Sequence, residues 1–94
     1  MAVKQAFSEV GLFNMYVVYL IQSLSDPKQK YIGSTSDLDQ RLKDHNVGCS
    51  VHTYKFKPWR LVVSVALDSK VKAENFEYYL KQGSGHAFAK RHLW

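Results

Sequence analysis

Residues 31–46, YIGSTSDLDQRLKDHN, place a phenol, a guanidinium and an imidazole within one short stretch. The stretch has the pattern of a strand end, a polar turn and a helix, and Arg41 and His45 lie four residues apart on that helix. Their Cβ atoms are therefore expected about 5–6 Å apart. The alternative interpretation is that Arg41 and His45 are simply two exposed polar residues, because such residues would show the same spacing. A guanidinium stays charged and binds phosphate oxygens through paired hydrogen bonds, so the functional interpretation is a phosphate site that includes Tyr31.

A carboxylate occupies an apolar stripe in a second predicted helix. Positions 73, 76, 77 and 80 are Ala, Phe, Glu and Leu, at the i, i+3, i+4, i+7 spacing of a core-facing surface. Burial of an unpaired carboxylate is costly, so Glu77 needs a partner. An ion pair with Lys81, in the favourable Glu-before-Lys order, contributes only about 0.2–0.5 kcal/mol. The alternative is that Glu77 binds a divalent metal ion at the edge of the core.

Three apolar segments predict the strands that position these residues. Residues 15–23, MYVVYLIQS, are β-branched and aromatic on both faces, as in a strand covered on two sides. Residues 30–34, KYIGS, predict the second strand of an antiparallel hairpin, in which Tyr31 and Gly33 share one side. Residues 59–67, WRLVVSVAL, predict a third strand. Together the segments predict a small three-stranded sheet.

Two helices are predicted to pack on this sheet. Polar residues can cap their first turns: Ser36 or Asp37 for the first helix, and Asp68 or Ser69 for the second. Asn46 and Gly48 end the first helix, and Gly83 and Gly85 stop the second. The tail HAFAKRHLW is expected to add one or two helical turns. The order β-β-α-β-α predicts an α/β protein in the broad sense, an α+β fold with a small sheet flanked by helices.

The chain of 94 residues fits one domain, residues 15–94, preceded by an N-terminal extension of residues 1–14. Its formal net charge of +5 favours a polyanionic partner, such as a nucleic acid, or an anionic membrane surface. Basic residues alternate with Tyr54, Phe56 and Trp59 in a segment without carboxylates, as on surfaces that track phosphates and touch bases. A solvated face is the alternative. The predicted nucleic-acid contacts are Lys55, Lys57, Arg60, Lys81, Lys90 and Arg91.

The composition argues against several other classes of protein. The single cysteine, Cys49, excludes an intrachain disulfide, and a cytoplasmic location, or a nuclear one in a eukaryote, is expected. No apolar run approaches the roughly 18 residues of a membrane span. Residues 1–14 lack the pattern of a signal peptide. Four scattered histidines and one cysteine lack the spacing of a zinc site.

The paired tyrosine strands, with Arg, His and Glu at these offsets, resemble the GIY-YIG nuclease superfamily. The YIG half is Tyr31-Ile32-Gly33, and Val17-Val18-Tyr19 stands in the place of GIY, with Tyr16 as an alternative first tyrosine. Arg41 lies ten residues past Tyr31, where the family carries its essential arginine. The resemblance is to small standalone members similar to the catalytic module of the excision-repair incision nuclease.

The same resemblance extends into the second helix and assigns roles. Residues 73–81, AENFEYYLK, are similar to the family's A-x-x-x-E segment, whose glutamate binds the metal. The resemblance implies an endonuclease of DNA, with a place in DNA repair. A domain this small is expected to recognise the shape of its substrate or a junction rather than a long sequence. The resemblance also implies Mg²⁺ or Mn²⁺, no small-molecule cofactor and no membrane. The implied catalytic residues are Tyr19, Tyr31, Arg41, His45 and Glu77, with Glu77 also the metal ligand.

Three points stay open at the level of sequence. The general base is Tyr19, Tyr31 or His45, because a free phenol with a pKa of about 10 is scarcely ionised at neutral pH. Asn46 is the loose counterpart of a late polar residue that many family members carry. The rival functions are an inactive nucleic-acid-binding module of the same fold and a protein-interaction domain that uses its basic face.

Overall fold

The computed structural model describes residues 15–94 and contains one antiparallel sheet in the strand order β2-β1-β3. Its strands are β1 (Tyr16–Ser23), β2 (Lys30–Thr35) and β3 (Trp59–Leu67). β1 and β2 form the predicted hairpin, and β1 also pairs with β3. β1 is therefore the central strand of the sheet.

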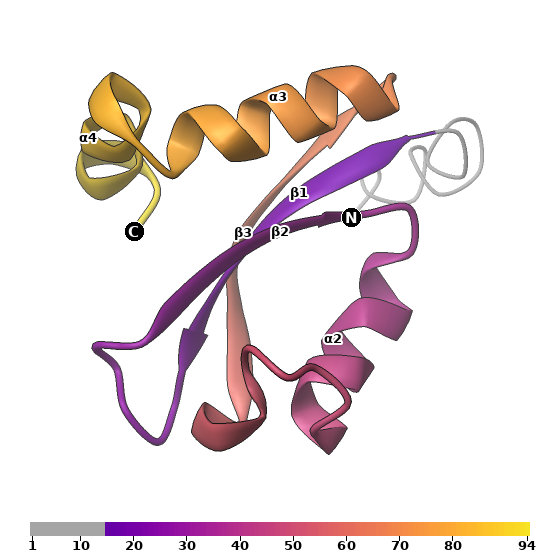
Figure 1. Cartoon of the computed structure of the whole chain (residues 1–94), viewed down its shortest axis with the longest axis vertical. Helices are drawn as coiled ribbons and strands as arrows, with labels where there is room; N and C mark the ends of the chain where they lie inside the picture. Colours follow the sequence, from indigo (N-terminus) through magenta and orange to yellow (C-terminus); the bar gives the residue numbers. More distant parts are fainter. Residues whose placement is uncertain (1–14) are drawn as a thin grey trace, which may run out of the picture.

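In the described part of the chain, four helical segments cover the two faces of the sheet. They are α2 (Leu38–Val47), the short 3₁₀ helix η2 (Tyr54–Phe56), α3 (Lys70–Leu80) and α4 (Gly83–His92). Figure 1 shows α3 and α4 on one side of the sheet and α2 with the η2 segment on the other. The predicted α+β class and the order of its first five elements are confirmed. None of the helices in residues 15–94 has the length and apolar character needed to cross a bilayer.

The sheet separates two apolar clusters because side chains alternate along β1. Val18 and Leu20 point towards α3 and α4, where they pack with Leu80 of α3. Tyr19 and Ile21 point towards α2 and the η2 segment. All five side chains are fully buried. A tyrosine on β1 therefore belongs to one face or the other according to its position in this alternation.

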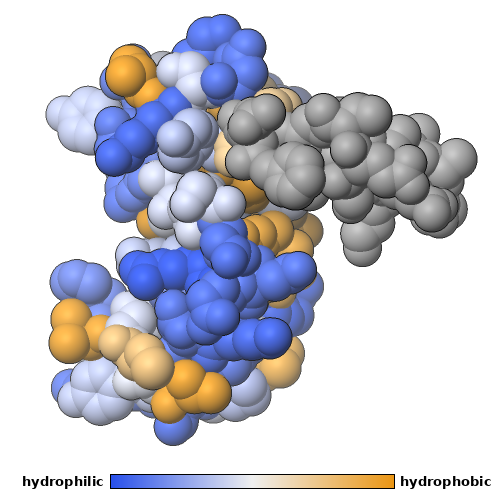
Figure 2. All heavy atoms as spheres, turned by 90° about the vertical axis from the view of Figure 1, so that its right-hand side faces the viewer, coloured by the Kyte–Doolittle hydropathy of each residue, from blue (hydrophilic) through white to orange (hydrophobic). Residues whose placement is uncertain are grey.

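The ends of α2 show why it begins and stops where the polar residues predicted. The Asp37 carboxylate accepts a hydrogen bond of 3.1 Å from the backbone N–H of Gln40, as an N-cap does. Gly48 ends the helix with a φ of 88°, in the left-handed region that favours glycine. Figure 2 shows a mainly hydrophilic surface in the lower half of the molecule, where α2 lies. The helix thus presents its polar face to solvent and its leucines to the sheet.

The C-terminal segment differs from the prediction. It forms the ten-residue helix α4, which begins at Gly83, rather than one or two turns after Gly85. A Cβ atom at Gly85 would lie 1.8 Å from the carbonyl oxygen of Tyr79, so this glycine lets α4 pack directly against the end of α3. The glycines stop α3, as predicted, but they also start the next helix: Gly83 adopts a φ of 57°, in the left-handed region that favours glycine, and Gly85 has no room for a side chain.

Candidate active site

The site begins with two residues that face each other across the hairpin. Tyr19 on β1 pairs with Gly33 on β2, and a Cβ atom at Gly33 would lie 2.5 Å from the Tyr19 hydroxyl oxygen. The absent side chain is therefore what allows the phenol to lie over the backbone of β2. This close approach gives the glycine of the YIG segment a physical reason.

A buried hydrogen-bonded chain runs from this phenol into the protein. The Tyr19 hydroxyl lies 2.8 Å from Nε2 of His45, and Nδ1 of the same imidazole lies 2.7 Å from Oγ1 of Thr53. All three side chains are essentially inaccessible to solvent. Burial, reinforced by the nearby Arg41 charge, lowers the pKa of His45. The imidazole is therefore neutral near pH 7 and can accept one proton.

Arg41 approaches the same hydroxyl from α2. Its Nε–H donates to the Tyr19 oxygen over 3.4 Å, and this contact helps to raise the pKa of Arg41. Burial raises the pKa of Tyr19, while the hydrogen bond from Arg41 opposes that increase. The phenol is therefore protonated in the free protein, and the guanidinium supplies the positive charge that favours its ionised form.

Tyr31 stands beside this chain on β2. Its ring centroid lies 5.2 Å from that of His45 and 6.3 Å from that of Tyr19. It is half-buried, as is Arg41, whereas Tyr19 and His45 are covered. The predicted tyrosine pair, arginine and histidine are thus brought together, with Tyr31 and Arg41 on the solvent side of the group.

Glu77 reaches the site from the opposite face of the sheet. Its Oε1 accepts a hydrogen bond of 2.7 Å from Ser34 on β2, and its Oε2 lies 2.7 Å from the ammonium of Lys81. Repulsion from this carboxylate is among the smaller effects that raise the pKa of Tyr19, so the two groups act on each other. The ion pair between Glu77 and Lys81, which is the non-functional alternative to a metal site in the sequence analysis, is present. Glu77 therefore lies at the β2 edge of the site with both oxygens partnered.

The side chains around Glu77 decide whether this site could hold the Mg²⁺ or Mn²⁺ ion that the family resemblance implies. Among residues 15–94, no three His, Cys, Asp or Glu side chains gather closely enough to hold an ion by themselves. Mg²⁺, however, commonly binds proteins through one or two carboxylates together with water and substrate phosphate. Glu77 fits that mode, because its carboxylate is accessible over 22% of the side-chain surface. Lys81 would then have to release Oε2.

Two alternatives from the sequence are placed elsewhere by the fold. Tyr16 packs on the α3 side of the sheet and so lies on the face opposite to Tyr31 and His45. Asn46 hydrogen-bonds both backbone groups of Trp59, accepting from the N–H over 2.6 Å and donating to the carbonyl over 3.3 Å. Its amide ties α2 to the start of β3 and does not point into the Tyr19 group.

The predicted nucleic-acid contacts lie on both sides of the sheet. Lys55 and Lys57 are exposed beside η2, whereas Lys90 and Arg91 are exposed on α4. Arg60 is exposed at the start of β3, and its guanidinium donates to the Gln22 side chain over 2.7 Å. The sixth, Lys81, pairs with Glu77 at the end of α3. They do not form one stripe, and only Lys81 contacts a predicted catalytic residue.

Sequence reasoning missed two residues that hold the site together. Thr53 orients His45, and Ser34 orients Glu77. Ser34 could have been found, because side-chain alternation places it on the face opposite to Gly33, towards α3. Thr53 lies in a loop after α2 without any periodic pattern, so its contact with His45 depends on the folded chain.

Comparisons with known proteins show which family this chain is similar to. The GIY-YIG catalytic domain matches residues 15–91. The structure-specific endonuclease subunit SLX1 of Candida dubliniensis is 38% identical over 87 residues, which cover 85% of this chain and 29% of that protein. The UPF0213 protein VPA1222 of Vibrio parahaemolyticus is 39% identical over 66 residues, or 69% of this chain and 60% of that one.

A solved structure is also similar. The solution NMR structure of the UPF0213 protein BH0048 from Bacillus halodurans shares 32% identity, covers 81% of this chain and 80% of its own, and gives a TM-score of 0.49. The chain spans less than a third of the length of the SLX1 subunits that it resembles. With the family match over residues 15–91, the conclusion is direct: this chain belongs to the GIY-YIG catalytic domain family.

Proposed function

We propose that this domain is a divalent-metal-dependent endonuclease that hydrolyses phosphodiester bonds in DNA and selects its substrate by structure. The observation that carries the proposal is the 2.8 Å hydrogen bond between Tyr19 and a buried, neutral His45, with the Arg41 guanidinium on the same hydroxyl. The printed names of the SLX1 relatives describe structure-specific endonuclease subunits, which supports the same activity here.

The Tyr19–His45 pair is assigned the proton transfer from water. His45 is fully buried and both of its ring nitrogens are engaged, so it cannot take a proton from water directly. Tyr19 can take that proton while it passes its own to His45, which is neutral near pH 7. Because Tyr19 is also covered in the free protein, water reaches it when Arg41 swings towards a phosphate. Substrate binding would thus open the site.

Arg41 and Glu77 are assigned the remaining tasks. Arg41 keeps its charge and presents the rest of its guanidinium for the phosphate oxygens, where it stabilises the charge of the transition state. Glu77 would hold Mg²⁺ or Mn²⁺ with water and phosphate as the other ligands. The bound ion would shield charge on the departing alkoxide. Lys81, released from Glu77, would then be available for a neighbouring phosphate.

A cleavage panel tests the proposal. Four-way junctions, flaps, single strands, blunt duplexes and structured RNA are incubated with the purified protein and Mg²⁺, Mn²⁺ or EDTA. The expected result is incision of junction or flap DNA with either metal and none with EDTA. Incision that persists in EDTA, or no incision of any substrate, would contradict it.

A second candidate function rests on a specific observation. Both oxygens of Glu77 are already bonded, to Ser34 and to Lys81, which suits a site that binds nucleic acid without a metal. Such a module would bind junction DNA equally well in EDTA and Mg²⁺ and would leave it uncut.

A further inference from the structure

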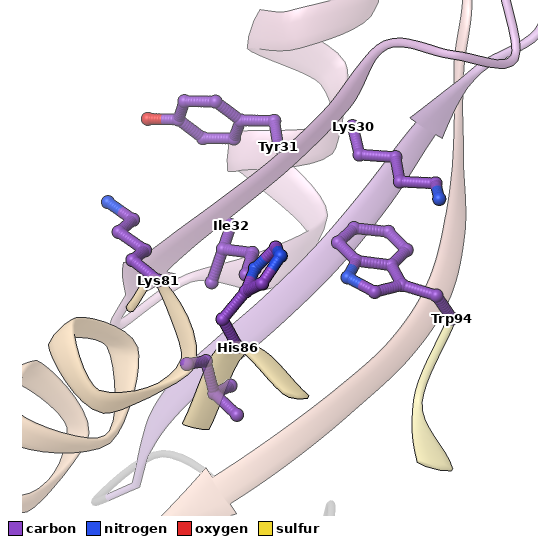
Figure 3. A pocket seen from close by; sticks show the side chains of 7 residues that line it. Lys30, Tyr31, Ile32, Lys81, His86 and Trp94 are labelled. Atoms are coloured by element: carbon purple, nitrogen blue, oxygen red, sulfur yellow. The ribbon is translucent and has the colours of Figure 1, made fainter. Parts of the chain in front are cut away.

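A second concavity lies at the edge of the sheet that β2 forms. It has a volume of ≈ 310 Å³, and its lining includes Lys30, Tyr31, Ile32, Lys81, His86 and Trp94, which Figure 3 shows around it; we call it the β2-edge pocket. Tyr31 belongs to both sites, because its ring also lies 5.2 Å from that of His45. Lys81 links them too, through its ion pair with Glu77. A ligand in this pocket would therefore adjoin the reacting phosphate.

The charge of the β2-edge pocket suits an anion. Lys30, Lys81 and His86 reach it from β2, the end of α3 and α4, and all three are exposed. Among residues 15–94, no aspartate or glutamate lines it. Lys81 is the only one of the three with an ion pair among the described residues, and its partner, Glu77, is the residue to which the metal is assigned. Metal binding would thus release a cation into the pocket.

The same pocket offers an aromatic surface. Trp94 is half-buried, and its backbone N–H donates to the carbonyl of Ala89 over 2.9 Å, which fixes the residue at the end of α4. The ammonium of Lys30 lies 5.3 Å from the centroid of the indole. Figure 3 shows the two side chains next to each other, and because Lys30 is exposed, this face of the ring can be approached from outside. A base that stacks there would displace the ammonium, and the flexible stem of the lysine lets it move to a phosphate.

We propose that the β2-edge pocket binds one unpaired nucleotide of the substrate strand, next to the bond that is cut, with its base on Trp94 and its phosphate on Lys30 and Lys81. A nucleotide inside a duplex cannot enter, because its base is stacked and paired. The pocket would therefore select junctions, flaps and single strands by shape. This inference rests on the proposed function in placing the nucleotide beside the cleaved bond.

The test is an NMR titration of the isotope-labelled protein in EDTA, which prevents cleavage. The chain contains two tryptophans, and the indole N–H of Trp59 is buried against the Thr53 carbonyl at 2.9 Å. Addition of a short oligothymidylate should shift the indole N–H resonance of Trp94 and leave that of Trp59 in place. A blunt duplex should shift neither. No response of Trp94 at saturating single strand, or an equal response to the duplex, would overturn the proposal.

Affinity measurements on variants supply the second readout. Trp94→Ala should weaken single-strand binding by roughly 5- to 150-fold, the range expected for loss of one stacked base. Trp94→Phe keeps a stacking ring and should bind nearly as the parent does. Tyr78→Ala, at an exposed aromatic on α3, is the matched control and should have no effect. If Trp94→Ala binds as the parent does, the pocket does not hold a base.

The two proposals fail separately. If the protein cuts junction DNA with Mg²⁺ but Trp94 does not respond to single strands, the β2-edge pocket is not a nucleotide site and the endonuclease function stands. If Trp94 responds and no substrate is cut, the pocket binds a nucleotide and the endonuclease function is wrong.

Discussion

The hydroxyl of Tyr19 is the atom on which three parts of the chain converge. β1 carries it, α2 brings Arg41 and His45 to it, and Gly33 leaves the space that it fills. Burial raises its pKa, so the free protein holds a protonated phenol with a proton acceptor directly behind it. The site is thus built to move a proton inward, away from solvent.

Tyr19→Phe removes the hydroxyl and keeps the ring. We expect the rate constant for cleavage to fall by about 10²–10⁴, the usual contribution of a positioned acid or base. Tyr16→Phe is the control, since Tyr16 lies on the opposite face of the sheet, and it should cleave as the parent does. Single-turnover rates on the preferred substrate measure both. Equal rates for Tyr19→Phe and the parent would show that another group takes the proton from water.

The buried His45 predicts a pH dependence of stability. Its pKa is lowered in the folded protein, so the unfolded chain binds the proton more tightly. The free energy of unfolding should therefore fall as the pH decreases below about 6.5, the ordinary pKa of histidine. His45→Gln should lose less stability over the same range, and His92→Gln, at an exposed position, should behave as the parent does. Urea unfolding at several pH values measures this, and identical pH profiles for His45→Gln and the parent would contradict it.

At the scale of the elements, the hairpin and the starts of the two helices could be predicted from the sequence. How the helices pack against the strands could not. The apolar residues on both faces of MYVVYLIQS predict a strand covered on both sides, and Asp37 and Ser69 cap the helices as expected. The choice between Tyr16 and Tyr19, however, depends on which face of β1 meets α2. The length of α4 is underestimated from sequence because Gly83 and Gly85 count as helix stops there. In the fold, Gly85 is needed for close packing against Tyr79, and Gly83 adopts a positive φ of 57°.

Gly33→Ala tests the close contact between β1 and β2. The new methyl group would lie 2.5 Å from the hydroxyl oxygen and 2.7 Å from Cζ of Tyr19, a fully buried ring. We expect a loss of about 1–3 kcal/mol in the free energy of unfolding, together with disruption of the Tyr19–His45 bond. Ser34→Ala is the control on the adjacent position, because it adds no atoms and costs only about 0.5–1.5 kcal/mol for its hydrogen bond. Equal stability of Gly33→Ala and the parent in urea would contradict the contact.

In the molecule as a whole, the residues of the site lie on both faces of the sheet, next to the edge strand β2. The Tyr19, Arg41 and His45 side chains lie on the α2 face of the sheet, and Glu77 and the β2-edge pocket lie on the α3 and α4 face. β2 separates the two groups: Ser34 bonds Glu77 on the α3 face, and Tyr31, whose ring lies beside His45, also lines the β2-edge pocket. Residue types and spacing indicate which side chains belong together. That residues from both faces of the sheet come together at β2 follows from the strand order β2-β1-β3, which places β2 at an edge and which the sequence pattern does not give.

A site that straddles β2 predicts that DNA contacts basic residues on both faces. Replacement of Lys55 and Lys57 by Gln, or of Lys90 and Arg91 by Gln, should each reduce the dependence of log K on log [salt] by about 2. Replacement of Lys43 and Lys72, which are exposed elsewhere, removes the same charge and should leave the slope near that of the parent. Binding isotherms in EDTA at several salt concentrations measure the slopes. A change in the slope for only one of the first two pairs would confine the DNA to one face.

The most direct test of the central claim compares two glutamates on the same helix. Glu77→Gln keeps the shape of the side chain and its contact with Ser34 but removes the charge that would hold the ion, whereas Glu74→Gln changes an exposed carboxylate one turn away. Single-turnover cleavage is measured against Mg²⁺ concentration for both variants. We predict that Glu74→Gln cleaves as the parent does and that Glu77→Gln falls to the rate seen in EDTA. Cleavage by Glu77→Gln at the parental rate, with the same metal dependence, would contradict the claim.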